Sequence, residues 1–392
     1  MFLTYHYKQK LRKCQVRIKK HFYAACRQKG FIMEKLKLGL VGCGKMMATH
    51  VSGVKLVDNV EIVAVCDILI ENAKEFAEQF GGNPKIYTNY RDMVDDVDAI
   101  MIALPHDLHY ECGMFFAQHN KHVLMEKPLC NTEEECLRLI EECDKRNLKL
   151  MCAYPVPYKP GVVKLKELID SGEYGEIIQF SAWTEQLTGS NVTFDDPLNR
   201  HWMLTNRLGG GQLFSHGCHY IDIMLWFLGE PVTGAHIGTR NGTPWMLREG
   251  TSAVVIKFEN GAIGYHGATW GARGTRLGYD FQIQTEKGLL EYEFDNDEIR
   301  LYNGSGEHVP QGHNESHSYT VIWKHSQVSA EHATKQTQHE IKHFVECILE
   351  DKEPMTSGRM ALQSLRIIWA LYNAEQNNTM ADLRGLGFGS VK

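Results

Sequence analysis

The sequence lacks long apolar runs and paired cysteines. No stretch approaches the roughly 20 consecutive apolar residues that a membrane-spanning helix needs, which argues against a helical membrane protein. The eleven cysteines are odd in number, scattered, and without a Cys-x-x-Cys pair, which argues against a disulfide framework and against a thiol-based zinc site. We therefore expect a protein of the reducing cytoplasm that has no membrane partner.

Acidic residues are absent from positions 1–32, although this segment holds nine of the 42 Lys and Arg residues. The rest of the chain is therefore acidic, with 33 basic residues against 48 Asp and Glu, which argues against a nucleic-acid partner. The basic segment also lacks the apolar stretch and small-residue cleavage site of a secretory signal. We interpret it as a disordered extension, or as sequence upstream of a start at Met33, rather than as a targeting or anion-binding arm.

Two glycines follow the first apolar run of the remaining chain. Residues 36–41 predict a buried strand, and Gly42-Cys43-Gly44 then leads into a helix that begins near Lys45. Glycine suits this place because the backbone must turn tightly and a diphosphate must approach the N–H groups at the start of the helix. A single Gly-x-Gly is a weak signal, and Met47 occupies the third glycine-like position.

A second predicted strand, residues 60–66, ends in Asp67, which stands 23 residues after Gly44. A carboxylate there can accept both ribose hydroxyls of an adenosine and repels a 2′-phosphate. Asp67 could instead cap the helix that follows. The order of strand, Gly-x-Gly, helix, strand and Asp favours the ribose role and predicts NAD rather than NADP.

Apolar and amphipathic segments continue to alternate as far as residue 154. We expect strands over residues 99–104, 122–125 and 148–154, and helices over residues 108–118 and 132–146. The pattern predicts a doubly wound parallel sheet over residues 33–154, whose ligands bind beyond the carboxyl ends of the strands. Three strand ends with polar residues or proline meet at that edge: Leu104-Pro105-His106, Glu126-Lys127-Pro128 and Tyr154-Pro155.

The character of the chain changes in the second predicted domain, residues 155–392. A helix is expected over residues 161–171, followed by short strands over 177–183, 252–258, 261–266, 279–284 and 289–294 with Asn-Gly or Lys-Gly turns between some of them. We expect a mainly antiparallel sheet with one open face. Another subunit often covers such a face, so we also expect a homo-oligomer.

A long polar stretch, residues 187–211, interrupts these strands without any periodicity. It contains Arg200, His201 and Trp202, and we predict a loop that covers the substrate, with a plain surface excursion as the alternative. Trp183, Trp202 and Trp270 could offer flat apolar faces to a sugar ring, or could belong to the core.

Histidines follow that loop directly. His216, His219 and Asp222 are spaced by three, which places them on neighbouring faces of a helix. We expect proton chemistry from them and no metal, because the segment has no His-Glu-x-x-His pattern and no thiol pair.

The chain from about Lys35 to its C-terminus resembles the Gfo/Idh/MocA family of NAD(P)-dependent oxidoreductases. Seven ordered segments carry the resemblance: VGCGKMMATH, VAVCD, ALPHDLH, MEKPL, LIDSGEYGEI, GGGQLFSHGCHYIDIMLWFLG and HFVECILEDKEPMTSGRMALQSLRIIWALYNA. The resemblance implies an α/β protein, with an N-terminal Rossmann domain and a C-terminal α/β domain whose large open sheet forms dimers, tetramers or hexamers. It also implies a dehydrogenase that acts on CH–OH groups of sugars, inositols or their glycosides.

The same resemblance assigns roles to individual residues. It implies that Lys127 lies beside the nicotinamide and hydrogen-bonds the reacting oxygen, and that Glu126 touches the nicotinamide ribose. His219 takes the place of the family's proton acceptor, and Asp222 follows it as it often does in relatives. We therefore expect Lys127 and His219 to be the catalytic pair.

Two positions depart from the family pattern. The family commonly has Asp where this chain has Ser215, so proton removal falls to His219 or Lys127, with a relay through His216 as a compensation. The other departure is a proline-rich turn that ends in Lys159, in place of an arginine-rich turn; we expect Lys159 to orient the substrate.

The candidate residues form two sets. The cofactor set is Gly42, Gly44, Lys45, Met46, Asp67, Leu104, Pro105, His106, His109, Glu126 and Lys127. The substrate set is Tyr154, Lys159, Trp202, Ser215, His216 and Asp222.

These residues predict a cytoplasmic NAD-dependent dehydrogenase that removes hydride from a secondary hydroxyl of a sugar or glycoside, with the 3-hydroxyl, which would give a 3-keto-glycoside, as one candidate. A lysine cation can stabilise the developing oxyanion while an imidazole accepts the proton. Ser215 keeps open an alternative, a glycosidase that holds NAD and works by transient oxidation and elimination. A cofactor-binding regulator without catalysis is disfavoured because Lys127 and His219 are both present.

Overall fold

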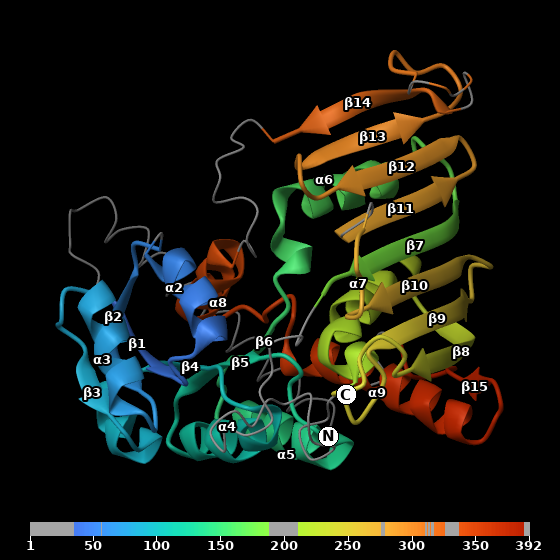
Figure 1. Ribbon diagram of the computed structural model, residues 1–392. Coiled ribbons are helices and arrows are strands. Elements are labelled where there is room, and N and C mark those ends of the chain that lie inside the picture. The colour runs from blue at the N-terminus through green and yellow to red at the C-terminus, as the bar shows by residue number, and fades with distance from the viewer. Residues whose placement is uncertain are drawn as a thin grey trace, which may run out of the picture.

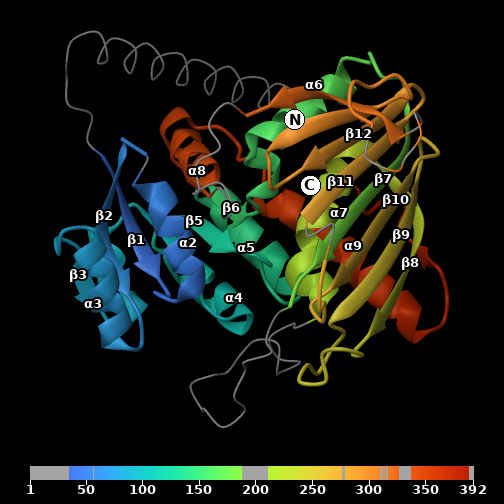
Figure 2. The same cartoon turned by 45° about the horizontal axis from the view of Figure 1, so that its top comes forward.

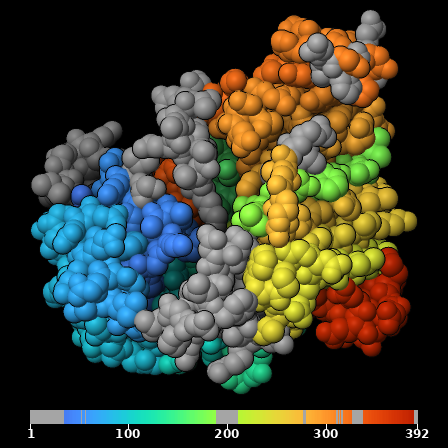
Figure 3. Space-filling view, viewed as in Figure 1, coloured from blue at the N-terminus to red at the C-terminus, as the bar shows by residue number. Residues whose placement is uncertain are grey.

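The computed structural model describes residues 35–55, 57–187, 211–275, 279–309, 312, 314, 317–325 and 337–387. The basic segment 1–32 and most of the predicted substrate loop, including Arg200, His201 and Trp202, lie outside these ranges. The described chain forms two sheets, which lie in separate parts of the molecule with helices between them (Figure 1). On the surface, the blue residues that follow position 35 and the yellow to orange residues of the second sheet occupy opposite sides (Figure 3).

The first sheet has six parallel strands in the order β3-β2-β1-β4-β5-β6. Its strands are β1 (Leu36–Val41), β2 (Val60–Cys66), β3 (Lys85–Tyr87), β4 (Ala99–Ile102), β5 (His122–Glu126) and β6 (Leu150–Ala153). All residues of β4 and β6 are buried, as expected for strands that helices cover on both faces. The predicted doubly wound sheet is confirmed; the short edge strand β3 was not foreseen.

Four helices accompany this sheet: α2 (Lys45–Val54), α3 (Ile70–Gln79), α4 (His109–Gln118) and α5 (Glu133–Lys145). Short 3₁₀ segments lie between and after the strands, namely η1 (Tyr90–Asp96), η2 (His106–Leu108) and η3 (Val156–Tyr158). The start of α5 is a capping box, because Thr132 Oγ1 accepts from the Glu135 amide and the Glu135 carboxylate accepts from the Thr132 amide. Local chemistry thus sets the start of this helix within one residue of the expected position.

The second sheet has nine strands in the order β14-β13-β12-β11-β7-β10-β9-β8-β15. They are β7 (Ile177–Glu185), β8 (Pro231–Thr239), β9 (Thr251–Phe258), β10 (Ile263–Thr269), β11 (Tyr279–Thr285), β12 (Gly288–Glu293), β13 (Glu298–Tyr302), β14 (Tyr319–Lys324) and β15 (Ala381–Asp382). Every neighbouring pair is antiparallel except β7 with β10. The predicted mainly antiparallel sheet is confirmed.

Helices cover one face of this second sheet (Figures 1 and 2). They are α6 (Pro160–Asp170), α7 (Cys218–Leu228) and α9 (Gly358–Gln376), and a π-helical segment, η6 (Leu213–Gly217), leads into α7. No helix among the described residues packs on the other face. The exposed side chains of Ile237, Val255 and Ile263 lie on that open face.

The C-terminal helices return to the first sheet. Helix α8 (Gln338–Glu350) packs against α2, and α9 packs against both α5 and α7. Ile341 and Phe344 of α8 share a buried cluster with Met47 of α2. The domain boundary near residue 154 stays a prediction. The structure adds that α8, from the last part of the chain, contributes to the core around the first sheet.

No helix in the described ranges is both long and apolar enough to cross a membrane. The cysteines within those ranges are all free and buried.

Candidate active site

The glycine turn after β1 leaves room at the start of α2. Gly42 has a φ of 87°, and a Cβ there would lie 2.4 Å from the carbonyl oxygen of Ala103, so this position requires glycine. A Cβ on Gly44 would meet nothing within 4 Å. Gly44 is the N-cap of α2 and makes no side-chain cap, so the amides of Lys45 and Met46 begin a helix end suited to an anion. These residues fit the diphosphate of a dinucleotide.

Asp67 is hydrogen-bonded to that turn. Its Oδ2 accepts a hydrogen bond from the Cys43 amide at 2.8 Å, and its Oδ1 accepts one from the Leu69 amide at 2.8 Å. Helix α3 takes Leu69 as its N-cap, so Asp67 is not the cap that the alternative interpretation required. The carboxylate stands at the end of β2 beside the glycine turn, where a ribose role remains our prediction.

His109 contacts the main chain at two of the predicted strand ends. Its Nδ1 lies 2.8 Å from the Pro128 carbonyl oxygen and its Nε2 lies 2.9 Å from the Leu104 carbonyl oxygen. Burial lowers the pKa of His109. With both ring nitrogens facing main-chain oxygens, His109 connects the loop after β4 to the loop after β5. Its effect on a cofactor would therefore act through these loops.

His106 lies where the two halves of the site meet. Its ring centre is 5.7 Å from that of His109 and 6.5 Å from that of Phe214 in η6. The loop formed by Leu104, Pro105 and His106 is thus positioned between the first sheet and the π-helical segment.

Glu126 and Lys127 end β5 and point to different neighbours. Glu126 Oε1 lies 2.7 Å from His50 Nε2, and Glu126 Oε2 accepts from the Lys127 amide at 3.0 Å. His50 Nδ1 lies 3.0 Å from Glu340 Oε1. Lys127 Nζ donates to the carbonyl oxygen of Ser215 at 3.0 Å. The structure therefore extends Lys127 away from its own sheet to η6.

His50 and Glu340 are site-supporting residues that the sequence analysis missed. His50 closes the segment VGCGKMMATH, so its place on α2 was a usable signal. Glu340 is distant from both partners in the chain, and only the packing of α8 on α2 reveals it.

Two side chains anchor the start of η6. The Leu213 amide donates to Glu249 Oε1 at 3.1 Å, and the Phe214 amide donates to the Tyr372 hydroxyl at 3.1 Å. Tyr372 in turn donates to Glu249 Oε1 at 2.6 Å. Helical segments with π geometry occur frequently at functional sites, and here one presents the carbonyl of Ser215 to Lys127.

The side chain of Ser215 takes no comparable part. It is fully buried, and its Oγ has no hydrogen-bond partner among the described residues. The contribution of this position to Lys127 comes from the main chain.

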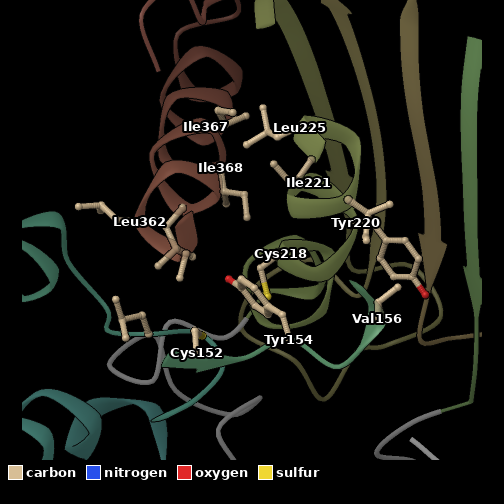
Figure 4. Close-up of a cluster of buried hydrophobic side chains, with 14 of the residues drawn as sticks. Cys152, Tyr154, Val156, Cys218, Tyr220, Ile221, Leu225, Leu362, Ile367 and Ile368 are labelled. Atoms are coloured by element: carbon tan, nitrogen blue, oxygen red, sulfur yellow. The ribbon is translucent and has the colours of Figure 1, made fainter. Parts of the chain in front are cut away.

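His219 lies among aromatic rings one turn further on. Its ring centre is 5.3 Å from those of Tyr154 and His216. Figure 4 shows Tyr154 beside Cys218, where the end of β6 meets α7 and α9. Burial raises the pKa of Tyr154 well above its ordinary value. The buried Tyr154 ring thus packs against the His219 ring on the side that faces the core.

His216 faces a second group of rings. Its ring centre lies 5.9 Å from that of Tyr279 and 6.4 Å from that of Trp270. Trp270 is buried in a small core cluster with Met246, which fits the core alternative, and its use as a sugar platform stays a prediction. Trp183 instead packs against Tyr265 on the open face of the sheet, with ring centres 5.0 Å apart, so the expectation of a sugar platform at Trp183 is wrong. The alternation of a strand turned its side chain away from α7.

Asp222 and Lys159 of the substrate set have shifted pKa values; Asp222 is buried and Lys159 is half-buried. Burial raises the pKa of Asp222 to about 8, so this carboxyl is mostly protonated at neutral pH. Burial lowers the pKa of Lys159 to about 8, and its Nζ lies 4.7 Å from the centre of the Phe294 ring. Phe294 lies 6.1 Å from Tyr279, which connects Lys159 to the rings around His216.

The structure therefore brings Lys127, Ser215, His216, His219 and Tyr154 together between the ends of β5 and β6 and the start of α7. Lys159 lies further out, and Trp202 is outside the described residues. Within those residues, no group of three or more His, Cys, Asp or Glu side chains is arranged to hold a metal ion.

Comparisons with known proteins identify the family of the chain. Residues 36–154 match the oxidoreductase family with an NAD-binding Rossmann fold, and residues 162–291 match the GFO/IDH/MocA C-terminal domain. Inositol 2-dehydrogenase of Salmonella typhimurium is 34% identical over 272 residues, which are 65% of this chain and 73% of that protein. Glucose-6-phosphate 3-dehydrogenase of Bacillus subtilis is 28% identical over 197 residues, 50% of this chain and 54% of that protein.

A solved structure of similar fold is levoglucosan dehydrogenase in complex with NADH. It has a TM-score of 0.77 and 20% identity, and the match covers 89% of this chain and 99% of that chain. At this identity the likeness concerns the fold. The matches of both domains and of the Salmonella enzyme establish the family: the chain belongs to the Gfo/Idh/MocA family of NAD(P)-dependent dehydrogenases.

Proposed function

We propose that this dehydrogenase transfers hydride between a secondary hydroxyl of a sugar or glycoside and NAD. The observation that carries the proposal is the bond from Lys127 Nζ to the Ser215 carbonyl, at 3.0 Å, because it holds an ammonium group at the main chain of η6, one residue before His216 and four before His219. An ammonium group at the carboxyl end of a parallel strand, with imidazoles on the segment that it contacts, suits the oxidation of an alcohol.

The chain's own residues divide the work. NAD, when bound, supplies the hydride acceptor. Lys127 stabilises the negative charge that develops on the substrate oxygen, and His219 accepts the hydroxyl proton. Glu126 contacts the nicotinamide ribose, and His216 stands where it can pass a proton onward from His219, since their ring centres are 5.3 Å apart.

NAD is proposed over NADP because of Asp67. Its carboxylate is held by two main-chain amides beside the glycine turn, so a negative charge faces the place where the adenosine ribose would lie. A 2′-phosphate would be repelled there.

The substrate class rests on the relatives. The Salmonella relative is named an inositol 2-dehydrogenase and the Bacillus relative a glucose-6-phosphate 3-dehydrogenase, both names that refer to a ring hydroxyl. We propose a pyranose or its glycoside, with the 3-hydroxyl as the position attacked. We also infer that the enzyme acts in the cytoplasm, since its described cysteines are free thiols.

The test is a substrate screen read in two ways. The enzyme is incubated with NAD and a panel of inositols, sugar phosphates and glycosides while reduced nicotinamide is followed by absorbance and products by mass spectrometry. We expect NADH to form together with a product that has lost two hydrogens. Release of free sugar without net NADH would support the glycosidase instead, and full turnover in both Lys127→Ala and His219→Ala would overturn the proposed catalytic pair.

A further inference from the structure

A buried chain of three ionisable side chains ends at Glu126. His50 of α2 lies between two carboxylates, with Nε2 2.7 Å from Glu126 Oε1 and Nδ1 3.0 Å from Glu340 Oε1. The exposed fractions are 1% for His50, 5% for Glu126 and 0% for Glu340, so water does not screen the charges. The three residues come from α2, the end of β5 and α8.

We propose that His50 and Glu340 are positioning residues for the cofactor: His50, held as an imidazolium between the two carboxylates, fixes the Glu126 side chain at the nicotinamide ribose. The inference rests on the proposed use of NAD. It extends that function to α8, a helix from the last part of the chain.

Charge balance supports the imidazolium. With a neutral His50, the site would enclose two carboxylates and no cation, which is costly in a buried place. Burial by itself lowers the pKa of His50, but its hydrogen bonds to Glu126 and Glu340 outweigh burial and raise the pKa to about 9. Both ring nitrogens can then donate, so both carboxylates are satisfied at once.

Other titratable groups lie further from His50, around Glu126 and Glu340. Lys127 and His109 lie on the Glu126 side, and the charge of Glu126 is felt by His109. Tyr158 lies on the Glu340 side and stays un-ionised, because burial raises its pKa far above the ordinary value. The groups that raise the pKa of His50 are the carboxylates of Glu126 and Glu340.

The packing of α8 on α2 fixes the geometry of Glu340. The Thr337 hydroxyl donates to the Thr49 carbonyl oxygen at 3.0 Å, one residue before His50. A Cβ on Gly53 would lie 2.6 Å from the Gln338 amide nitrogen, so the two helices approach as closely as glycine permits. Glu340 therefore reaches His50 only while α8 is seated on α2, and the setting of Glu126 depends on that contact.

Glu126 connects His50 to the backbone of Lys127. Its Oε1 is held by His50 while its Oε2 accepts from the Lys127 amide at 3.0 Å, so the carboxylate cannot rotate without disturbing the backbone of the catalytic lysine. Removing the charge of Glu340 should thus weaken cofactor binding and lower turnover, with little effect on the affinity for the sugar.

The protonation state of His50 is the first test, and it needs no cofactor. The full chain, with its 19 histidines labelled with ¹³C, is titrated by NMR, and the loss of one signal in His50→Gln assigns His50. We expect His50 to stay an imidazolium to about pH 9 and its midpoint to fall by roughly one pH unit or more in Glu340→Gln. A wild-type midpoint near the ordinary value of about 6.5 would overturn the proposal, even if the variant fails to fold.

Cofactor affinity is the second test. NADH binding is followed by fluorescence for the wild type, Glu340→Gln and the matched control Glu346→Gln, an exposed glutamate on the same helix. We expect the dissociation constant to rise about 10-fold in Glu340→Gln, and to stay unchanged in the control. If the wild type binds NADH and Glu340→Gln binds it with the same dissociation constant, this inference alone is overturned. A wild type that neither binds NADH nor oxidises any sugar would overturn the proposed function.

Discussion

The ammonium group of Lys127 donates a hydrogen bond to the backbone carbonyl of Ser215, with Nζ and O 3.0 Å apart. Lys127 follows β5 of the first sheet, and Ser215 lies in the π-helical segment before α7, so this bond joins the two halves of the chain. Because the acceptor is a main-chain oxygen, the contact does not depend on the side chain at position 215. The orientation of Lys127 therefore rests on the main chain of η6 rather than on the Ser215 side chain.

Removing the Lys127 amine should abolish most catalysis without preventing cofactor binding. Lys127→Ala takes away the only group proposed to stabilise the oxyanion, and we expect kcat to fall about 10²- to 10³-fold. Steady-state kinetics with the substrate found in the screen measure kcat, and fluorescence titration measures NADH binding. Lys74→Ala, on the exposed surface of α3, is the control and should behave as the wild type. A kcat within a few-fold of wild type would remove Lys127 from the mechanism.

The anchor at the start of η6 should contribute to stability. Tyr372→Phe deletes the hydroxyl that donates to Glu249 and accepts from the Phe214 amide, and it leaves both partners buried. We expect the free energy of unfolding to fall by about 1–3 kcal/mol, measured by urea denaturation. Tyr174→Phe, at a half-buried turn, should change it by less than about 0.5 kcal/mol. Equal effects of the two substitutions would contradict a specific role for the Tyr372 hydroxyl.

Asp67 should decide between the two nicotinamide cofactors. Asp67→Asn removes the negative charge and keeps an acceptor for only one of the two amides, those of Cys43 and Leu69. We expect the preference for NAD over NADP, taken as the ratio of kcat/KM values, to shrink by about 10-fold because the repulsion of the 2′-phosphate is lost. A ratio that stays constant would assign Asp67 to turn geometry alone.

The open face of the second sheet should be a subunit interface. Ile237, Val255 and Ile263 are 72%, 45% and 45% exposed on neighbouring strands, which is unusual for a sheet that faces water. Val255→Glu places a charge at the centre of this patch, and we expect light scattering to report smaller particles than the wild type gives. Ile86→Glu, on the exposed edge strand of the first sheet, is the control. A monomeric wild type would contradict the interface.

The sequence predicted those parts of the structure that depend on neighbouring residues. The strand before Gly42 is visible because all but one of its residues are buried, and the start of α5 because Thr132 and Glu135 cap it locally. The turn at Asn260-Gly261 is also predictable from its own residues, because Gly261 has a φ of 88°, which glycine adopts without strain. In each case the physical cause lies within a few residues of the feature.

The rest depends on contacts between distant segments. Nothing near Glu340 signals that α8 will seat it against His50, and nothing near Ser215 signals that its carbonyl will hold Lys127. The direction of Trp183 follows from strand register, which the sequence pattern did not decide for this strand. The family resemblance thus supplied the catalytic candidates, whereas the contacts that support them are seen in the fold.

Asp222 should make the fold less stable as the pH rises. Burial raises its pKa to about 8 in the folded protein, whereas an Asp in an unfolded chain titrates near pH 3.9. Between about pH 4 and pH 8 the folded state therefore keeps a proton that the unfolded chain has released, so unfolding releases a proton and stability falls with increasing pH. Above that range the carboxylate is ionised within the core. Asp222→Asn has nearly the same shape and cannot ionise.

The measurement is the melting temperature of the wild type and of Asp222→Asn at pH 5, 7 and 9. Subtracting one from the other cancels groups that titrate alike in both proteins, such as Asp280, whose pKa burial also raises to about 8. We expect the variant to gain on the wild type with each step in pH, by at least about 3 °C between pH 5 and 9. A constant difference would mean that Asp222 does not titrate in this range and that a nearby donor holds its charge.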